Sequence, residues 1–494
     1  MKKNIIILLL AVVGFVSCND DYLETSPSSS ISEADVFASI SGTQTVIEGM
    51  HRLMYAYGGA HSRFGQKAVD YTLEVLGEDF FPNERGYGWF VSQYQYLMHR
   101  NIQNADLEYI WSFYYDLVAN ANMILSNIDK VPTASTEEAQ RDNIKAQALT
   151  YRAFAHYQLV QLFAERYKYE ATGTNSQLGI PVVLTPGPEG LPRSTVEEVY
   201  TQIKKDLTDA IALFNAKGKD FARGADVSQI NLNVAEAISA RISLTTGDWQ
   251  NAVTHARNAR AGRTLITDYT YGWNKANSEW IWGALLIDEQ QTSYASFFSH
   301  IDPLFGGYAT LGNHKMGSKA ILDFMNDSDQ RKMVFNSHAF GETTFKNRFK
   351  SKENVGWKYT GFGEWTNDYL YIKAGEMYLI EAEALARQGG NDTEAINVLT
   401  TLVKKRDPEY TAPDLTGESL INHILMQRRC ELWGDGQRFL DIKRINKGMD
   451  RRGLGHNESL WDAASNYPAG AKEFLFLIPK QEMDSNPNMV QNPL

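Results

Sequence analysis

The chain has few cysteines, no excess of positive charge and none of the common motifs of catalysis. Only two of its 494 residues are cysteines, Cys18 and Cys430. Its 59 acidic residues outnumber 48 lysines and arginines, which leaves a net charge of −11 and no basic footprint for nucleic acid. No HExxH, GxSxG or Walker-type phosphate loop occurs. The sequence therefore gives no support for a nucleic-acid partner, a bound metal ion or a cofactor.

The one long apolar run lies at the N-terminus. Lys2 and Lys3 precede an apolar stretch over residues 5–16. A short apolar run after a basic start is typical of a secretory signal peptide, and it is shorter than a membrane-spanning helix. We therefore assign residues 1–17 to a signal peptide.

A cysteine follows this run directly. The ending from Phe15 to Cys18 resembles a bacterial lipobox, in which the cysteine becomes the lipidated first residue of the mature chain. An ordinary signal peptide with an incidental cysteine is the alternative. If Cys18 carries lipid, no intrachain disulfide is possible, and Cys430 is expected to be a buried free thiol. Residues 18–31 are polar and form a tether.

Helix pairs recur along the rest of the chain. Residues 369–406 indicate two helices joined by a tight turn at Gly389-Gly390, and the first helix is apolar or small around most of its circumference. The same plan, or a single long helix, is indicated at residues 231–260, 148–162 and 199–214. Because such hairpins cannot bury their apolar faces alone, we expect them to stack, in units that resemble tetratricopeptide repeats.

The helix pair at residues 369–406 carries two further expectations. Charged residues recur at helical spacing on its first helix and are expected to form one solvated stripe: Lys373, Glu376, Glu383 and Arg387. Asn391, followed three residues later by Glu394, predicts a capping box at the start of the second helix.

Residues 262–365 are the least helical part of the chain. They contain a good strand pattern at residues 279–287, on which Trp280 and Trp282 alternate on one face and are expected to pack in the core. Aromatic residues follow among loop signals. An earlier segment, residues 77–93, also mixes aromatic residues with glycine, proline and asparagine, and surface loops of this kind often carry function.

Two more segments complete the pattern. Residues 179–192 hold four of the fourteen prolines and predict an extended connector. Near the C-terminus, a helix around residues 421–433 and a charged segment to Arg444 precede the strand pattern FLFLIP at residues 474–479.

Several motifs together resemble one family, the SusD/RagB outer-membrane lipoproteins of Bacteroidota. CNDDYLETSP resembles the mature start of that family, and the acidic pair after Cys18 resembles its surface-export signal. AQALTYRAFAHYQLVQLFAERY followed by GIPVV resembles its N-terminal half. YIKAGEMYLIEAEAL, RRCELWGDGQRFLDIKR and FLFLIPKQEMDSNPNMVQNP resemble its C-terminal half. The resemblance spans nearly the whole chain in order.

The resemblance implies a mainly α fold, a tetratricopeptide-like α-α superhelix with an irregular, loop-rich ligand-binding region and a few short strands. It implies an N-terminal helical region at residues 32–261 and a C-terminal region at residues 262–494. Within the latter, residues 262–365 would carry the ligand face, and residues 369–445 the returning helical repeat.

The same resemblance implies a role in nutrient uptake at the cell surface. A lipid-anchored protein of the outer membrane would capture oligosaccharides, or peptides in some members, and deliver them to a SusC-like TonB-dependent transporter. Neither catalysis nor a cofactor is implied.

Sugar recognition suits flat aromatic faces with amides, carboxylates and guanidinium groups nearby. One loop offers both kinds of group, and its candidate ligand contacts are Asn83, Arg85, Tyr87, Trp89 and Phe90. Further candidates, expected in exposed loops, are Tyr294, Phe298 and Tyr308. Packing of these rings against the helices is the alternative reading.

A dense charged run near the C-terminus is interpreted as structural. We expect an ion-pair network together with a solvated face from Arg428, Arg429, Glu431, Arg438, Asp441, Lys443 and Arg444. Two other functions stay open at this point. One is a surface glycoside hydrolase, because a catalytic carboxylate pair is defined by its separation in space. The other is a repeat scaffold that binds only protein.

Replacing Cys18 with alanine should leave a foldable but unanchored protein. The helical segments all begin after the polar tether, so the substitution removes the lipid attachment and no part of the core. Stable anchoring requires more than one acyl chain, as a triacylated lipoprotein would have. The measurement is the distribution of Cys18→Ala between membrane and soluble fractions in a strain that lacks the partner transporter. Retention of the variant in the outer-membrane fraction would contradict the assignment.

Overall fold

The computed structural model describes the chain in these ranges: residues 33–217, 226–271, 273–290, 294–302, 307–309, 311, 313–335, 338–340, 343–345, 367–461 and 464–494. The signal peptide, Cys18 and the whole tether lie outside the described residues. None of the described helices is both long enough and apolar enough to cross a membrane.

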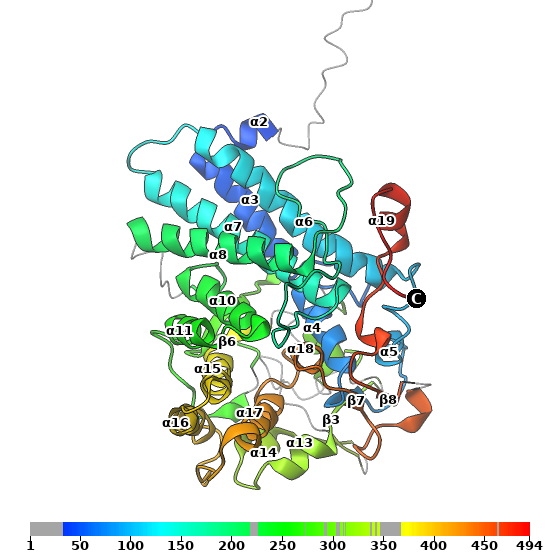
Figure 1. Cartoon of the computed structure of the whole chain (residues 1–494). Helices are drawn as coiled ribbons and strands as arrows, with labels where there is room; N and C mark the ends of the chain where they lie inside the picture. The colour runs from blue at the N-terminus through cyan, green and yellow to red at the C-terminus, as the bar shows by residue number, and fades with distance from the viewer. Residues whose placement is uncertain are drawn as a thin grey trace, which may run out of the picture.

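A stack of paired helices forms one side of the molecule and descends through the view of Figure 1. Its members, in chain order, are α3 (Ile40–Leu53), α6 (Ala105–Asn127), α7 (Glu138–Phe163), α8 (Val196–Lys217), α10 (Leu232–Thr246), α11 (Trp249–Ala259), α15 (Ala374–Gln388), α16 (Asp392–Val403) and α17 (Gly417–Glu431). Each helix contacts its neighbours in the stack, so the expected tetratricopeptide-like superhelix is confirmed.

The remaining α-helices are shorter, and in Figure 1 α5 and α19 lie at the right while α4 and α18 lie near the centre. The short α-helices are α2 (Glu33–Val36), α4 (Gln66–Val75), α5 (Val91–Tyr94), α12 (Phe297–Ile301), α13 (Lys319–Phe324), α14 (Gln330–Phe335), α18 (Arg438–Arg444) and α19 (Lys480–Ser485). Single 3-10 turns are η3 (Ile128–Lys130), η4 (Tyr269–Tyr271), η5 (Asp288–Gln290), η6 (Glu458–Leu460) and η7 (Lys472–Phe474).

The strands of the described residues form antiparallel pairs. These are β1 (Phe80–Pro82) with β3 (Lys315–Gly317), β2 (Trp280–Ala284) with β6 (Tyr369–Lys373), β4 (His338–Phe340) with β5 (Thr343–Phe345), and β7 (Met449–Asp450) with β8 (Asn466–Tyr467). The strand expected at residues 279–287 is confirmed as β2, and Trp280 and Trp282 are both buried in the core as expected.

The strand expected at residues 474–479 is wrong. After η7 the segment is extended but joins no ladder. The backbone N–H of Phe476 donates to the carbonyl of Leu162, and that of Leu477 donates to the carbonyl of His99. The apolar side chains of this segment are buried, but the segment packs on the C-terminal end of α7 and joins no sheet. The last carbonyls of a helix lack donors within the helix, and this segment supplies one.

The helix pair α10–α11 shows how the local sequence fixes a repeat. The Asn231 side chain accepts a hydrogen bond from the N–H of Val234 and begins α10. Gly247 ends that helix with φ of 72°, a conformation that favours glycine, and Asp248 caps α11 at once. The small residues of α10 are fully buried, which lets α8, α11 and α15 approach it closely.

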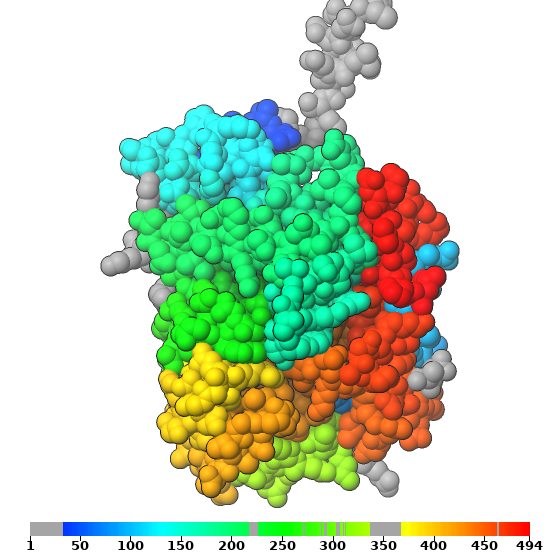
Figure 2. All heavy atoms as spheres, viewed as in Figure 1, coloured from blue at the N-terminus to red at the C-terminus, as the bar shows by residue number. Residues whose placement is uncertain are grey.

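The connector at residues 179–192 contains no regular element, as expected. It lies against the C-terminal segment in Figure 2, where the two are drawn in green and red. Asn486 and Asn488 donate side-chain hydrogen bonds to the carbonyls of Leu191 and Gly190. The connector therefore joins the helical stack to the far end of the chain.

Residues 369–406 depart from expectation in three ways. The first five residues form strand β6, not helix. The predicted solvated stripe is wrong, because Lys373, Glu376 and Glu383 are at most 2% exposed and only Arg387 is partly exposed. Asn391 makes no side-chain cap hydrogen bond, so the predicted capping box is wrong as well. Helical spacing does place Glu376, Glu383 and Arg387 on one face of α15, but that face is largely covered by other helices, and Lys373 belongs to β6.

Each buried carboxylate of α15 has an arginine partner from another helix. Glu376 accepts hydrogen bonds from Arg241 of α10 at 2.8 and 2.6 Å. Glu383 accepts two from Arg444 of α18 at 2.8 and 2.7 Å. The charged run at residues 428–444 is thus an ion-pair network as expected, but the solvated face predicted for it is wrong, because its side chains are buried or nearly so.

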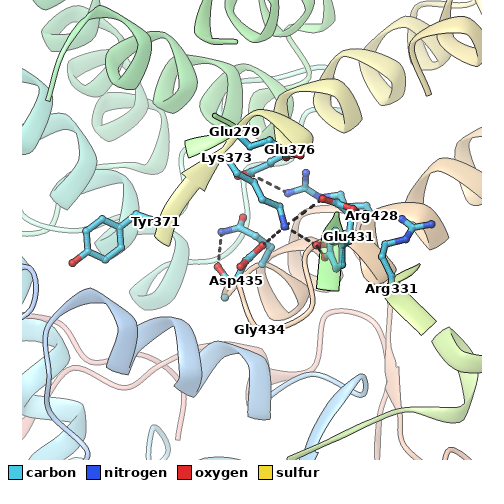
Figure 3. Close-up of polar contacts among 12 residues, drawn as sticks. Glu279, Arg331, Tyr371, Lys373, Glu376, Arg428, Glu431, Gly434 and Asp435 are labelled. Carbon is cyan, nitrogen blue, oxygen red and sulfur yellow. Dashed lines mark hydrogen bonds and ion pairs between the residues drawn. The ribbon is translucent and has the colours of Figure 1, made fainter. Parts of the chain in front are cut away.

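The most deeply buried ion pairs surround Glu431 at the end of α17 (Figure 3). Its carboxylate lies 3.0 Å from Arg406 Nη2, 3.4 Å from Lys373 Nζ and 3.6 Å from Arg331 Nη1. Burial would raise the pKa of Glu431, but the cations outweigh it, Arg406 foremost, and lower that pKa to about 2. The neighbouring thiol of Cys430 is free and buried, as expected.

Replacing Arg406 with methionine should destabilise the fold by about 3–5 kcal/mol, because it leaves the fully buried Glu279 and Glu431 without their shared cation. Chemical unfolding at neutral pH measures the change. In the wild type, the ion pairs of Glu431 contribute fully to stability above the ordinary pKa of this carboxyl group, 4.5. The wild type loses this contribution as the pH falls through about 2.

The matched control is Arg452→Met. Arg452 pairs with Asp450 at 2.7 Å, but the two side chains are 59% and 50% exposed, so its loss should leave the free energy of unfolding almost unchanged. Equal effects of the two substitutions would contradict the structural role given to the buried pairs.

Candidate functional site

A loop with two left-handed glycines follows β1. Gly86 and Gly88 have φ of 50° and 86°, which favours glycine, and the N–H of Gly88 donates to the carbonyl of Arg85 at 2.9 Å. This tight turn lifts the ring of Tyr87 into solvent, where it is 68% exposed. Arg85 is exposed beside it.

Both ends of this loop are held by hydrogen bonds to other segments. The N–H of Asn83 donates to the carbonyl of His314 at 2.8 Å, and Asn457 Nδ2 donates to the carbonyl of Asn83 at 2.9 Å. Asn313 Nδ2 reaches the carbonyl of Trp89 at 3.3 Å. The loop is therefore preorganised, although it contains no helix or strand.

Six rings from three separate stretches of the chain meet around this loop. We name them the aromatic platform: Tyr57, His61, Tyr87, Trp89, Tyr294 and Tyr308. Tyr308 is central, with ring centroids 5.5 Å from Tyr87, 5.8 Å from Trp89 and 5.5 Å from Tyr294. Every ring is exposed or only partly buried. The platform is thus an aromatic surface open to solvent.

Two histidines, one in the platform and one buried beneath it, fix the ring of Tyr308. His61 Nδ1 lies 2.5 Å from the Tyr308 hydroxyl. His300 is fully buried, stacks on Tyr308 at 5.0 Å and hydrogen-bonds through Nε2 to the carbonyl of His61 at 2.8 Å. Burial lowers the pKa of His300 to about 3, so its ring is neutral and Nε2 carries the donated proton. Burial also raises the pKa of Tyr308, which keeps its hydroxyl protonated.

The structure brings four of the sequence-derived candidates together, namely Tyr87, Trp89, Tyr294 and Tyr308. Asn83 and Arg85 lie on the same loop and supply polar groups at its edge. Ligand contact by these six residues stays a prediction.

Two candidates are corrected. Phe90 is 3% exposed, with its ring 4.2 Å from that of Tyr71, and Phe298 is 2% exposed and stacks on Tyr369. Phe298 lies in α12, not in an exposed loop. Both rings pack in the core, where Phe90 precedes α5 directly and Phe298 is part of α12.

Sequence reasoning missed Tyr57 and His61. The signal was present, because Gly58 and Gly59 stand between these rings in the same mixture of glycine and aromatic residues that indicated the loop at residues 83–90. An isolated bridge between Tyr57 and Phe64 closes this second loop.

Acidic and metal-ligating side chains do not gather at the platform. None of its six members is a carboxylate, and Glu84 is exposed on the neighbouring turn. Within the described ranges, no group of three or more His, Cys, Asp or Glu side chains is placed to hold a metal ion. The arrangement is suited to contact with a flat, uncharged molecule.

Comparison with known proteins matches both halves of the chain. Residues 21–244 match a family model described as "Starch-binding associating with outer membrane", and residues 255–494 match the SusD family. A SusD-like protein P2 from Formosa agariphila is 23% identical over 100% of this chain and 99% of its own length.

Solved structures share the fold. A SusD-like carbohydrate binding protein from Bacteroides vulgatus superposes with a TM-score of 0.77 at 23% identity, over 92% of this chain and 97% of that one. Surface glycan-binding protein A from Bacteroides fluxus gives a TM-score of 0.70 at 17% identity, over 92% and 99%. The two family models together span nearly the whole chain, and the protein belongs to the SusD/RagB family.

Proposed function

We propose that this protein is a non-catalytic, lipid-anchored glycan-binding protein of the cell surface, and that the aromatic platform holds an oligosaccharide. The observation that carries the proposal is the convergence of six solvent-accessible rings on one preorganised loop. Sugar rings have apolar faces that stack on such surfaces, while their hydroxyl groups bond to neighbouring polar groups.

The energetics of a platform suit weak, reversible capture. Covering about 100 Å² of apolar surface at roughly 25 cal/mol/Å² contributes about 2.5 kcal/mol before ordering costs. Millimolar affinity corresponds to only about 4 kcal/mol. One large ring such as Trp89 would therefore supply much of the affinity of a weak site.

The comparisons support a glycan as the ligand. One similar structure is named a carbohydrate binding protein, another a surface glycan-binding protein, and a third a laminarin binding SusD-like protein. A peptide would need partners for its charged termini and backbone amides, and the platform offers rings in their place. The matched family model is described as starch-binding, which supports capture over hydrolysis.

Delivery of the ligand is proposed to require a membrane partner. The family description associates the matched region with the outer membrane. A ligand held outside must pass to a protein that crosses the membrane, for which we propose a SusC-like TonB-dependent transporter. The platform draws Tyr57 and Trp89 from residues 32–261 and Tyr308 from residues 262–494, so in this proposal the two regions share the ligand face.

Replacing Trp89 with alanine should weaken retention of polysaccharide about tenfold or more, because it removes the largest ring of the platform. The ring is only partly buried, so the melting temperature should change little. Affinity electrophoresis against a panel of polysaccharides, with the mature protein, measures retention, and reducing-end assays on the same mixtures detect cleavage.

The matched control is Trp249→Ala, which removes a partly buried tryptophan of α11 that packs on Tyr169, away from the platform. It should leave retention unchanged. A Trp89→Ala protein with a lower melting temperature and normal retention would place Trp89 among packing residues. New reducing ends would identify an enzyme.

The transporter proposal makes a separate prediction. Extraction of cell membranes in mild detergent, followed by affinity capture of the tagged full chain, should recover a large outer-membrane barrel protein in near-equal amount. After a detergent that dissociates the two proteins, mixing them again in mild detergent should restore the complex. Recovery of the protein alone under several mild detergents would count against delivery to a bound transporter.

A further inference from the structure

A buried lysine without a counter-charge lies next to the loop at residues 83–90. Lys315 of β3 is 2% exposed, and no carboxylate of the described residues forms an ion pair with its amine. Two other buried lysines do have such partners, since Lys67 lies 3.1 Å from Asp70 and Lys373 lies 3.0 Å from Asp435. Lysine is almost never fully buried unless it is paired, because burial of an unpaired amine costs free energy. An ion pair therefore does not account for the place of Lys315 in the core.

The amine of Lys315 is directed at a single residue, Asn313. Nζ donates to the backbone carbonyl oxygen of Asn313 and to its Oδ1, the latter at 2.7 Å. Burial lowers the pKa of Lys315 well below its ordinary value of 10.5, which favours the uncharged amine. An uncharged amine has two protons to donate, and the two oxygens of Asn313 accept them both.

This contact determines which way the Asn313 amide points. Because the amine donates to Oδ1, the amide nitrogen faces the opposite side, where Nδ2 donates to the carbonyl of Trp89 at 3.3 Å. An asparagine amide that turns over exchanges its donor for its acceptor. In the reversed orientation, Oδ1 would face the Trp89 carbonyl and the amide N–H groups would face the protons of Lys315. The lysine therefore selects the orientation that holds Trp89.

The segment that carries these two residues holds the platform loop at both of its ends. At the first end, the N–H of Asn83 donates to the carbonyl of His314 at 2.8 Å, a backbone contact that does not depend on a side chain. At the second end, the carbonyl of Trp89 is held by the side chain of Asn313. The position of the second end thus depends on an amide whose orientation is set from the core.

We propose that Lys315 is a positioning residue of the aromatic platform, whose amine orients Asn313 so that Asn313 holds Trp89 in place for a ligand. The ligand contact of Trp89 rests on the proposed function, but the hydrogen-bond chain from Lys315 through Asn313 to Trp89 does not. Positioning explains why a lysine stands here. An apolar side chain of similar length would fill the same space without the cost of burying an amine, but it would leave the Asn313 amide free to turn over.

Two substitutions break this chain of hydrogen bonds at different points. Lys315→Met keeps the length of the side chain and removes the amine. Asn313→Asp keeps an acceptor for the amine but removes the donor to the Trp89 carbonyl. Because Asn313→Asp also supplies the carboxylate that Lys315 lacks, this variant should fold even where Lys315→Met does not. The matched control is Lys443→Met, a buried lysine whose amine donates to carbonyls at the end of α7.

Fluorine NMR of the mature protein, labelled with fluorotryptophan, reports on Trp89 without any ligand. The line of Trp89 is the one that disappears in Trp89→Phe. We expect Lys315→Met and Asn313→Asp to shift or broaden this line, and Lys443→Met to leave it unchanged. An unchanged Trp89 line in either of the first two variants, once folded, would overturn the proposal.

Polysaccharide retention tests whether this positioning matters for the ligand. One hydrogen bond between uncharged groups corresponds to about a twofold to tenfold change in an equilibrium constant, so each variant should weaken retention by about that factor. The double variant should be no weaker than the weaker single variant, because both act through the same contact.

The two measurements separate this inference from the proposed function. Normal retention in a variant whose Trp89 line has moved would overturn the positioning role in binding. If the wild type retains no polysaccharide, the proposed function fails, and the fluorine spectra still decide whether Lys315 positions Trp89.

Discussion

Buried charge must be paired, and here the pairing connects the helical stack to the aromatic platform. Glu431 of α17 holds Lys373 at the end of β6 and Arg406 beyond α16. Strand β6 in turn carries Tyr369, whose hydroxyl accepts a hydrogen bond from the N–H of Phe297 and whose ring stacks on Phe298. These contacts fix α12, and α12 carries His300, which supports the platform. A chain of direct contacts thus runs from the most buried ion pairs to the surface that we propose binds ligand.

This arrangement explains how irregular segments form a preorganised surface. Loops gain little from local hydrogen bonds, so their order depends on the elements to which they are attached. The loop at residues 83–90 is held through His314, Asn313 and Asn457, and the ring of Tyr308 is held through His300 and His61. A rigid set of rings loses little conformational entropy when a ligand covers it, which favours binding by a small surface.

The sequence was a good guide to the helices and a poor guide to burial. Apolar spacing located α7, α8, α10 and α11, because one face of a packed helix repeats with its turn. It could not show that the charged face of α15 is also covered, since Glu376 and Glu383 meet their arginines, Arg241 and Arg444, only in three dimensions. The same limit applies to FLFLIP, because the N–H groups of Phe476 and Leu477 donate to carbonyls of α7 and His99 that lie more than 300 residues away in the chain.

The candidate site was predicted in part, for a related reason. Aromatic residues among glycines indicated the loop with Tyr87 and Trp89, but only the fold shows which rings converge. Phe298 and Tyr294 lie four residues apart, and one is buried while the other belongs to the platform. Spacing within a loop has no fixed period, so it does not predict which side chain faces solvent. Tyr57 and His61 were missed because the segment that carries them follows a helix directly.

The central claim is that the aromatic platform holds the oligosaccharide. A crystal structure of the mature protein with a bound oligosaccharide, chosen from the polysaccharide that it retains, tests this claim most directly. The account predicts sugar rings stacked on Trp89 and Tyr87, within reach of Asn83 or Arg85. An oligosaccharide bound at a surface that includes none of the six platform rings would contradict it.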